Sequence, residues 1–217
     1  MKIAILTTPG NWFVEYVEKL HHLLKESDFD VSTFFEHEKI DDGYEVVFIL
    51  SYHRIIQKEF LLQHKHNLVV HASDLPLGKG WAPFFWQVLE GRSEIIFTLF
   101  EAGERVDDGQ IYLQKKITLS GHELYDDLRK IQSETTIVIC REFLENYHDI
   151  VPREQVGSES FYDKRSAEDS VLDINKTIAE QFNLLRTVNN EDFPAFFEID
   201  GHRYILKIEH DEREMKR

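Results

Sequence analysis

Residues 46–71, VVFILSYHRIIQKEFLLQHKHNLVVH, contain two short apolar runs separated by a segment with helical spacing. The run at 46–50 carries no polar side chain, which is typical of a strand buried on both faces of a sheet. Residues 57–64 have the periodicity of a helix, and residues 67–71 form a second short strand pattern. A strand, a helix and a second strand in this order predict parallel pairing through a right-handed crossover.

The same alternation continues on both sides of this stretch. Before it, the patterns predict a strand over 2–6, a helix from residue 12 and a strand over 31–35. After it, they predict a short helix over 82–90, strands over 95–100 and 111–117, and a long helix that a Ser120–Glu123 capping box begins. Together these elements predict an α/β, Rossmann-like fold with a mostly parallel sheet in a domain over residues 1–150.

Residues 151–217 predict a separate C-terminal extension. A polar connection up to residue 170 is followed by a helix pattern over 171–188. Two short strand patterns then flank Asp200-Gly201, a pair that favours the type I′ turn of a β-hairpin. Three apolar rings near the hairpin need covering, which indicates a small subdomain or a homodimer interface; they are Phe193, Phe196 and Phe197.

The composition excludes several classes of partner. The formal net charge is −15, from 25 Lys and Arg against 40 Asp and Glu, and such a surface repels nucleic-acid backbones and anionic membranes. The single cysteine, Cys140, cannot form a disulfide within the chain, which fits a reducing compartment. The N-terminus lacks the apolar core of a signal peptide, and no apolar run is long enough to span a bilayer. We therefore expect a cytoplasmic protein.

Well-known catalytic motifs are missing from the sequence. The segment after the first predicted strand, TTPGNW at 7–12, lacks the G-x-G-x-x-G pattern of dinucleotide-binding enzymes. Neither a Walker A loop, nor H-E-x-x-H, nor a nucleophile elbow occurs. His64, His66 and His71 are close in sequence, but no further ligand accompanies them, so we predict no metal site and two solvated histidines at a strand entry.

Residues 71–83, HASDLPLGKGWAP, place a histidine at the end of a predicted buried strand, before a Pro- and Gly-rich loop. Open α/β sheets bind their ligands at this edge. A second loop, VDDG at 106–109, brings the carboxylate of Asp107 to the end of another strand. A histidine and an aspartate that converge there suit proton transfer during acyl transfer. The residues alone also allow a hydrogen-bonded core histidine at His71 and a turn-forming Asp107 before Gly109.

These two stretches resemble the signature of the N10-formyltetrahydrofolate-dependent formyltransferases. That signature runs N-x-H-x-S-x-L-P, followed by a Gly-containing loop and A-P, and later D-x-G. The matching residues, in order and spacing, are His71, Ser73, Leu75, Pro76, Gly80, Ala82, Pro83, Asp107 and Gly109. The resemblance covers roughly residues 1–150 and points to the short bacterial sugar N-formyltransferases of the pseudaminic-acid type.

The resemblance implies formyl transfer from N10-formyltetrahydrofolate, as co-substrate, to the primary amine of a nucleotide-linked amino sugar. It implies that His71 and Asp107 are catalytic. The folate would be held by Ser51, Tyr52, His53, Arg54, Ile55, Leu75, Pro76, Gly78, Lys79, Gly80, Asp107, Asp108 and Gly109. The candidates for the acceptor site are Trp12, Ser73, Trp81, Lys164, Arg165 and Asp169; for the two tryptophans, core packing is the alternative.

One position departs from the family pattern. Val69 stands where the family has an asparagine whose amide stabilises the oxyanion, and Val69 cannot donate a hydrogen bond. Loss of one such donor costs roughly 3 kcal/mol, unless a backbone N–H or the side chain of Ser73, Tyr52 or His53 replaces it. Val69 favours a folate-binding descendant without catalysis as one alternative. Transfer to another amine such as glycinamide ribonucleotide, and release of formate by hydrolysis, are further alternatives that the sequence leaves open.

Overall fold

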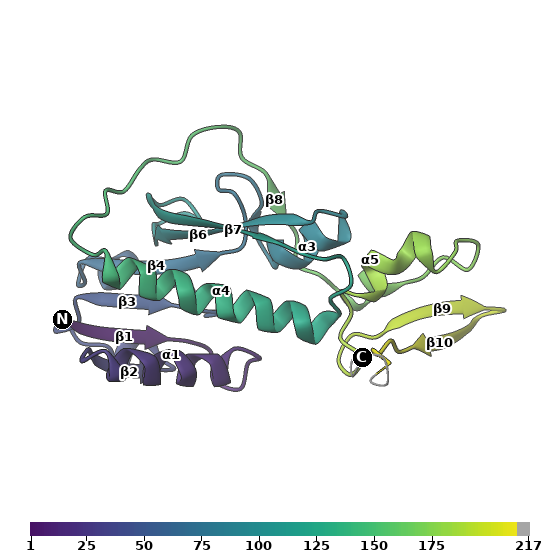
Figure 1. Ribbon diagram of the computed structural model, residues 1–217, viewed down its shortest axis with the longest axis horizontal. Coiled ribbons are helices and arrows are strands. Elements are labelled where there is room, and N and C mark those ends of the chain that lie inside the picture. The colour runs from purple at the N-terminus through teal and green to yellow at the C-terminus, as the bar shows by residue number, and fades with distance from the viewer. Residues whose placement is uncertain (212–217) are drawn as a thin grey trace.

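The computed structural model describes residues 1–211, whose main body is a six-stranded sheet in the order β2-β1-β3-β4-β6-β7 (Figure 1). Four strands pair in parallel, and two further strands continue the sheet antiparallel beyond β4. The strands are β1 (Lys2–Leu6), β2 (Asp30–Phe34), β3 (Val46–Ile49), β4 (His66–His71), β6 (Glu94–Glu101) and β7 (Ile111–Thr118). The predicted α/β, Rossmann-like fold with a mostly parallel sheet is confirmed.

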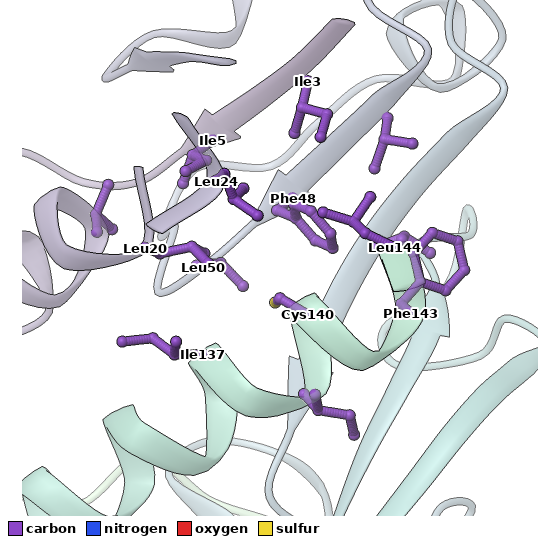
Figure 2. Close-up of a cluster of buried hydrophobic side chains, with 14 of the residues drawn as sticks. Ile3, Ile5, Leu20, Leu24, Phe48, Leu50, Ile137, Cys140, Phe143 and Leu144 are labelled. Atoms are coloured by element: carbon purple, nitrogen blue, oxygen red, sulfur yellow. The ribbon is translucent and has the colours of Figure 1, made fainter. Parts of the chain in front are cut away.

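Two helices, α1 (Val14–Glu26) and α4 (Tyr125–Glu145), cover one face of the sheet (Figure 1). Figure 2 shows their side chains, Leu20 and Cys140 among them, meeting Phe48 of β3 in a dry core. Burial raises the pKa of the Cys140 thiol, so this side chain acts as a small apolar residue. Within residues 1–211, no helix combines the length and the apolar character that crossing a bilayer needs.

The opposite face of the central strands is covered by shorter elements. The 3₁₀ turn η1 (His37–Lys39) and helix α2 (Lys58–Leu61) lie over it, and α2 is shorter than the helix predicted over 57–64. Side chains alternate along β1, so that Ile3 and Ile5 face the α1/α4 core while Ala4 and Leu6 face α2. This burial on both faces explains why the central strands are continuous apolar runs.

The segment after β4 is anchored by helix α3 (Pro83–Leu89). Its rings pack into a second buried cluster that includes Phe97 of β6 and Leu128 of α4. Just before α3, the short strand β5 (Lys79–Gly80) pairs in parallel with β8 (Phe161–Tyr162). The anchored helix and this pairing hold the Pro- and Gly-rich loop against the carboxyl edge of the main sheet.

Helix α4 starts later than predicted. Glu123 does accept a hydrogen bond from the backbone N–H of Ser120, but the helix begins at Tyr125 with Leu124 at its N-cap. The backbone N–H of Leu124 instead donates to Asp127, 3.1 Å away. Glu123 also pairs with Arg186 of the C-terminal extension at 2.8 Å, so the Ser120–Glu123 contact closes a loop that joins the two parts of the chain.

The predicted helix over 171–188 is wrong for most of its length. The structure has the 3₁₀ turns η2 (Ala167–Ser170) and η3 (Ala179–Gln181), followed by a single α-turn, α5 (Phe182–Leu185). An Asp173–Asn175 turn interrupts the pattern, and helical structure begins only after Thr177, whose N–H donates to Glu180.

The predicted β-hairpin is confirmed. Strands β9 (Ala195–Ile199) and β10 (His202–Leu206) flank a turn in which Asp200 and Gly201 have φ angles of 51° and 78°. Two consecutive positive φ angles are those of a type I′ turn. Of the three rings near the hairpin, Phe196 is buried, Phe197 stacks on Tyr204, and Phe193 is half exposed.

Candidate active site

His71 is the last residue of β4 and lies at the carboxyl edge of the sheet. Its Nε2 atom is 2.8 Å from the carbonyl oxygen of Gly78 and 3.6 Å from Oδ2 of Asp107. Because a carbonyl oxygen only accepts hydrogen bonds, we assign the hydrogen to Nε2, which leaves Nδ1 as an acceptor in the neutral ring. The His71 and Asp107 side chains are only 10% and 13% exposed, so the structure brings the predicted pair together in a largely dry site.

Asp107 lies on the loop between β6 and β7 in a left-handed conformation with φ 51°. Its Oδ2 accepts a hydrogen bond of 2.9 Å from the backbone N–H of Gly80. Two residues later, a Cβ atom on Gly109 would lie 1.6 Å from the carbonyl oxygen of Glu101, so only glycine fits. The D-x-G spacing therefore corresponds to a tight loop that aims the carboxylate at His71.

The Pro- and Gly-rich loop supplies the other side of this pair. Gly78 and Gly80 have φ angles of 68° and 92°, in the left-handed region that favours glycine. A Cβ atom on Gly80 would lie 2.5 Å from the carbonyl oxygen of Tyr162. Gly80 thus lets β5 run close against β8 while its N–H group points at Asp107.

Lys79, which the sequence placed among the folate-binding residues, has its ammonium group inside the protein. The residue is 1% exposed, and Nζ lies 2.6 Å from Glu159 and 3.1 Å from Asp108. Asp108 also pairs with Arg105 at 2.7 Å. Burial lowers the pKa of Lys79, but the hydrogen bonds that its ammonium donates to the two carboxylates outweigh this effect and raise the pKa; the same contact with Lys79 lowers the pKa of Asp108. Lys79 remains charged and ties the loop carrying Asp107 to the Pro- and Gly-rich loop.

A segment that the sequence marked only as a polar connection crosses both loops. We call residues 153–162 the strap. Nε2 of Gln155 donates to the carbonyl oxygens of Asp107 and Gly109, each at 2.9 Å. Ser160 accepts a hydrogen bond from the N–H of Gly78 at 2.8 Å. Sequence reasoning missed these roles, because a polar segment without periodicity carries no sign of the distant backbone groups to which it binds.

Replacing Gln155 tests whether the strap positions Asp107. Gln155→Met keeps the length of the side chain but removes both hydrogen bonds to the loop. We expect kcat for formyl transfer to fall by about one to two orders of magnitude, as the loss of two bonds of ~1 kcal/mol each predicts. The exposed Gln63→Met is the matched control. An unchanged kcat in Gln155→Met, with folding verified by thermal denaturation, would show that the strap does not position the carboxylate.

The predicted folate loop, Ser51–Ile55, lies beside the loop after β1. The carbonyl oxygen of Ser51 accepts a 2.8 Å hydrogen bond from Asn11, and the N–H of His53 donates to Thr8 at 3.1 Å. Ser51 has a φ angle of 53°. The loop therefore turns sharply where β3 ends and leaves its following residues at the carboxyl edge of the sheet.

Three side chains of this loop point in different directions. The Tyr52 hydroxyl lies 2.8 Å from Nδ1 of His37, and Arg54 pairs with Glu38, so both side chains are engaged at η1. Ile55 is 84% exposed. The contacts of the first two side chains leave the backbone and the exposed side chains of His53 and Ile55 as parts of this loop that can meet a ligand.

A cavity of about 730 Å³ opens at the same edge of the sheet. Its walls come from the loop after β1, from the starts of α3 and α4, and from the C-terminal extension. Trp12 and Arg165, two of the predicted acceptor residues, line it. Ala82 also lines it, two residues after the Gly80 that binds Asp107, so the segment 80–82 links the cavity to the His71–Asp107 pair.

The other predicted acceptor residues lie outside this cavity. Ser73 lines a second cavity of about 170 Å³, where its buried hydroxyl has no hydrogen-bond partner among the described residues. Nζ of Lys164 lies 5.1 Å from the centre of the Trp81 ring, which is 47% exposed. Asp169 accepts hydrogen bonds from the N–H and hydroxyl of Ser166 and so caps η2. The structure thus groups Trp12 with Arg165 and separates them from Ser73 and Asp169.

Arg129 is a lining residue that the sequence reasoning missed. It comes from α4, and its guanidinium lies 4.0 Å from the ring centre of Trp12 and 4.4 Å from that of Phe85. An arginine among charged helix residues looks solvent-exposed in sequence. The available signal was its spacing from Tyr125, because residues four apart on a helix are neighbours.

The histidines considered for a metal site are engaged in the core. His64 contacts the carbonyl oxygen of Tyr44 at 3.0 Å, and His66 contacts the hydroxyl of Tyr112 at 3.1 Å. Nowhere in residues 1–211 do three His, Cys, Asp or Glu side chains gather in a way that could hold a metal ion.

Comparison with known proteins places this site in a family. A family model described as "Formyl transferase" matches residues 2–139, a span that contains both His71 and Asp107. A methionyl-tRNA formyltransferase of Ehrlichia ruminantium is 27% identical over 185 residues, which cover 84% of this chain and 61% of that protein. The chain thus spans about three-fifths of the length of this relative.

Solved structures share the fold. A methionyl-tRNA formyltransferase from Clostridium thermocellum superposes with a TM-score of 0.81 at 17% identity, covering 98% of this chain and 95% of that one. A sugar N-formyltransferase from Shewanella gives 0.71 at 14% identity, covering 97% and 98%. HypX from Aquifex aeolicus in complex with tetrahydrofolic acid gives 0.77 at 17% identity, covering 96% and 37%. The family match extends over more than half of the sequence and includes the paired histidine and aspartate, and the chain therefore belongs to the formyl transferase family.

Proposed function

We propose that the chain transfers the formyl group of N10-formyltetrahydrofolate to the primary amine of a nucleotide-linked amino sugar. The observation that carries this proposal is the pairing of His71 Nε2 with Asp107 Oδ2, 3.6 Å apart, at the ligand-binding edge of a formyl transferase fold. A largely buried imidazole and carboxylate at this edge suit proton transfer during acyl transfer.

Three loops around the pair provide the groups that would hold the folate. They are residues 51–55, 75–80 and 107–109. A fourth group is Oε1 of Gln155, which is buried beside Asp107 and has no hydrogen-bond partner within residues 1–211. A buried acceptor without a donor is costly, so it suits a ligand rich in N–H groups, such as a pterin. Bound there, N10-formyltetrahydrofolate supplies the formyl carbon.

Each residue of the pair has a definite task in this reaction. The neutral amine of the acceptor forms a bond to the formyl carbon, and the bond from that carbon to N10 breaks. The hydrogen on Nε2 of His71, which the carbonyl oxygen of Gly78 accepts in the free protein, is the one that His71 would donate to the formyl oxygen as negative charge develops on it. Asp107 accepts the proton that the amine loses, and the proton passes to N10 of the departing tetrahydrofolate, directly or through water. Oδ1 of Asp107 is available for this step, since the hydrogen bond from Gly80 goes to Oδ2.

Val69 bears on the rate of this reaction. It lies two residues before His71 and packs near Phe100, and it offers no donor to the formyl oxygen. The amide of Asn67 is occupied by the carbonyl oxygen of Leu61, and the Tyr52 hydroxyl by His37. These contacts leave a backbone N–H, the hydroxyl of Ser73, which is unpartnered within the described part of the chain, or the ring of His53 as the replacement donor. A folate-binding protein without catalysis is the second candidate, and Val69 is the observation that favours it.

The choice of acceptor rests on two observations about the molecule. A net charge of −15 disfavours tRNA, although the curated relatives are named methionyl-tRNA formyltransferases. The cavity of about 730 Å³ is lined by Ala82, two residues after the Gly80 that binds Asp107, and is large enough for a nucleotide-linked sugar. Some structures with the same fold are described as sugar N-formyltransferases, which is consistent with this choice.

The test is a direct assay of formyl addition. The full chain is incubated with N10-formyltetrahydrofolate and a panel of nucleotide-linked amino sugars, and the products are read by mass. Parallel samples contain methionyl-tRNA, glycinamide ribonucleotide, or no acceptor. We expect a formylated amino sugar with the wild-type chain and none with His71→Ala. Formylation of methionyl-tRNA alone, or formate release that needs no acceptor, would overturn the proposed acceptor; tetrahydrofolate binding without any product would support the non-catalytic alternative.

A further inference from the structure

The large cavity is lined by two arginines that form no ion pair with a carboxylate of residues 1–211. Arg129 enters it from α4, and Arg165 enters it from the segment between the strap and η2. Across residues 1–211, neither guanidinium has a carboxylate oxygen within ion-pair distance; their polar contacts are with a hydroxyl, a side-chain amide and a carbonyl. Arg153 also lacks such a partner among the described residues, but Arg129 and Arg165 differ from it in that they line the cavity.

Arg129 is held in place by neutral groups. Its Nε donates to the hydroxyl of Tyr125 at 3.0 Å, and its Nη1 donates to Oε1 of Gln132 at 3.1 Å. The rings of Trp12, Phe85 and Tyr125 surround the guanidinium at 4.0–5.1 Å. Aromatic faces fix a guanidinium without cancelling its charge, so Arg129 is preorganised and its Nη2 hydrogens stay available for a ligand.

Arg165 lines the same cavity from a segment of the C-terminal extension. Its Nη1 donates to the carbonyl oxygen of Thr187 at 3.3 Å, and the ring of Trp86 lies 5.8 Å from its guanidinium. Burial lowers the pKa of Arg165, and the positive charge of Arg129 lowers it further, while Asp169 opposes the effect. Arg129 thus lies close enough to influence Arg165, although the attraction of Asp169 outweighs this repulsion.

The acidic residues of the cavity do not compensate this charge. Glu15, Asp126 and Asp192 line the cavity, but all three are exposed at its rim, whereas Arg129 and Arg165 are partly buried. Asp192 accepts a hydrogen bond from Asn189 instead. Positive charge inside and negative charge at the rim favour a ligand whose anionic end enters the cavity.

We propose that Arg129 and Arg165 together bind a phosphate or diphosphate group of the acceptor, and so make negative charge a condition of acceptor recognition. This inference rests on the proposed formyl transfer, and it identifies the chemical group by which the acceptor is selected. Two planar guanidinium groups match the several oxygens of a phosphate ester better than they match one carboxylate. A volume of about 730 Å³ also exceeds what a sugar alone needs.

The experiment measures binding, without requiring turnover. Isothermal titration of the full chain uses UDP, inorganic pyrophosphate, uridine and galacturonate as probes. We expect UDP and pyrophosphate to bind, and uridine and galacturonate to bind far more weakly. Arg129→Gln and Arg165→Gln should each weaken UDP binding about tenfold or more, as the loss of hydrogen bonds to a charged group predicts. Arg141→Gln, on the exposed face of α4 beside Glu145, is the matched control.

Several outcomes would overturn the inference. Equal UDP affinity in the wild type and in both variants would show that the phosphate lies elsewhere. Preferential binding of galacturonate would assign the pair to a carboxylate, and failure of both UDP and pyrophosphate to bind would exclude a phosphate site. Thermal denaturation checks the fold of each variant; if Arg129→Gln does not fold, Arg165→Gln and the charge-preserving Arg129→Lys carry the test. Tetrahydrofolate is titrated in parallel, because its failure to bind would count against the proposed formyl transfer alone.

Discussion

Asp107→Asn is expected to reduce kcat for formyl transfer by about 10³-fold, within the ~10²–10⁴ range that general acid–base groups contribute. The asparagine side chain has nearly the same shape, tolerates the left-handed backbone, and its oxygen can still accept from the N–H of Gly80. It cannot take the proton of the attacking amine or stabilise a positive charge on His71. The loss should therefore appear in kcat, while the dissociation constant of tetrahydrofolate stays nearly unchanged.

The control for this variant is available in the same chain. Asp28 is exposed and also has a left-handed backbone, with φ 61°, so Asp28→Asn makes the same chemical change far from His71. Steady-state kinetics of both variants, with folate binding measured separately, isolates the role of the Asp107 charge. Turnover of Asp107→Asn within a factor of about three of the wild type would rule out this carboxylate as the proton acceptor.

Lys79→Met is expected to lower the free energy of unfolding by about 3 kcal/mol. The substitution removes the one cation that Asp108 and Glu159 share and leaves Asp108, which is 22% exposed, next to an apolar side chain. We expect the low end of the range for broken buried pairs, because Glu159 is 47% exposed and stays hydrated. The charge of Arg105 remains beside Asp108 and limits the loss further.

Equilibrium denaturation in urea measures this effect. Lys19→Met is the comparison, since Lys19 forms an exposed pair with Glu134 at 3.8 Å and its loss should cost less than about 1 kcal/mol. If Lys79→Met is as stable as Lys19→Met, the free energy lost by desolvating the buried ammonium equals the free energy gained from its two ion pairs. The fold would then not depend on this contact.

The elements that were predicted correctly are those whose signals are local. The conformations of the strand Val46–Ile49 and of the Asp200-Gly201 turn are each determined by a few neighbouring residues. His71 and Asp107 could be proposed as partners because each stands in a short motif at the end of a strand. The helix over 171–188 failed because apolar spacing there was mistaken for a continuous helix, although the Asp173–Asn175 turn interrupts it.

The features that escaped prediction depend on contacts between distant parts of the chain. The contact of Gln155 with the carbonyl of Asp107 could not be predicted, because the two residues are 48 positions apart and no pattern near Gln155 indicates the contact. The environment of Arg129 also could not be predicted, because its guanidinium is covered by Trp12 from the other end of the domain. The burial of Lys79 likewise depends on Glu159, a residue in a segment without any periodic pattern. Side-chain partners of this kind are decided by tertiary folding.

The strap also has a consequence for how such proteins can diversify. The strap contacts the backbone of Asp107 near its start and the glycine loop through Ser160. The chain then continues to Arg165 in the wall of the cavity. A graft that exchanged everything after residue 150 for the tail of a relative would replace, at the same time, part of the wall of the large cavity and the residues that hold the loop of Asp107. We therefore expect relatives that use different acceptors to differ also in the residues that position the carboxylate of Asp107.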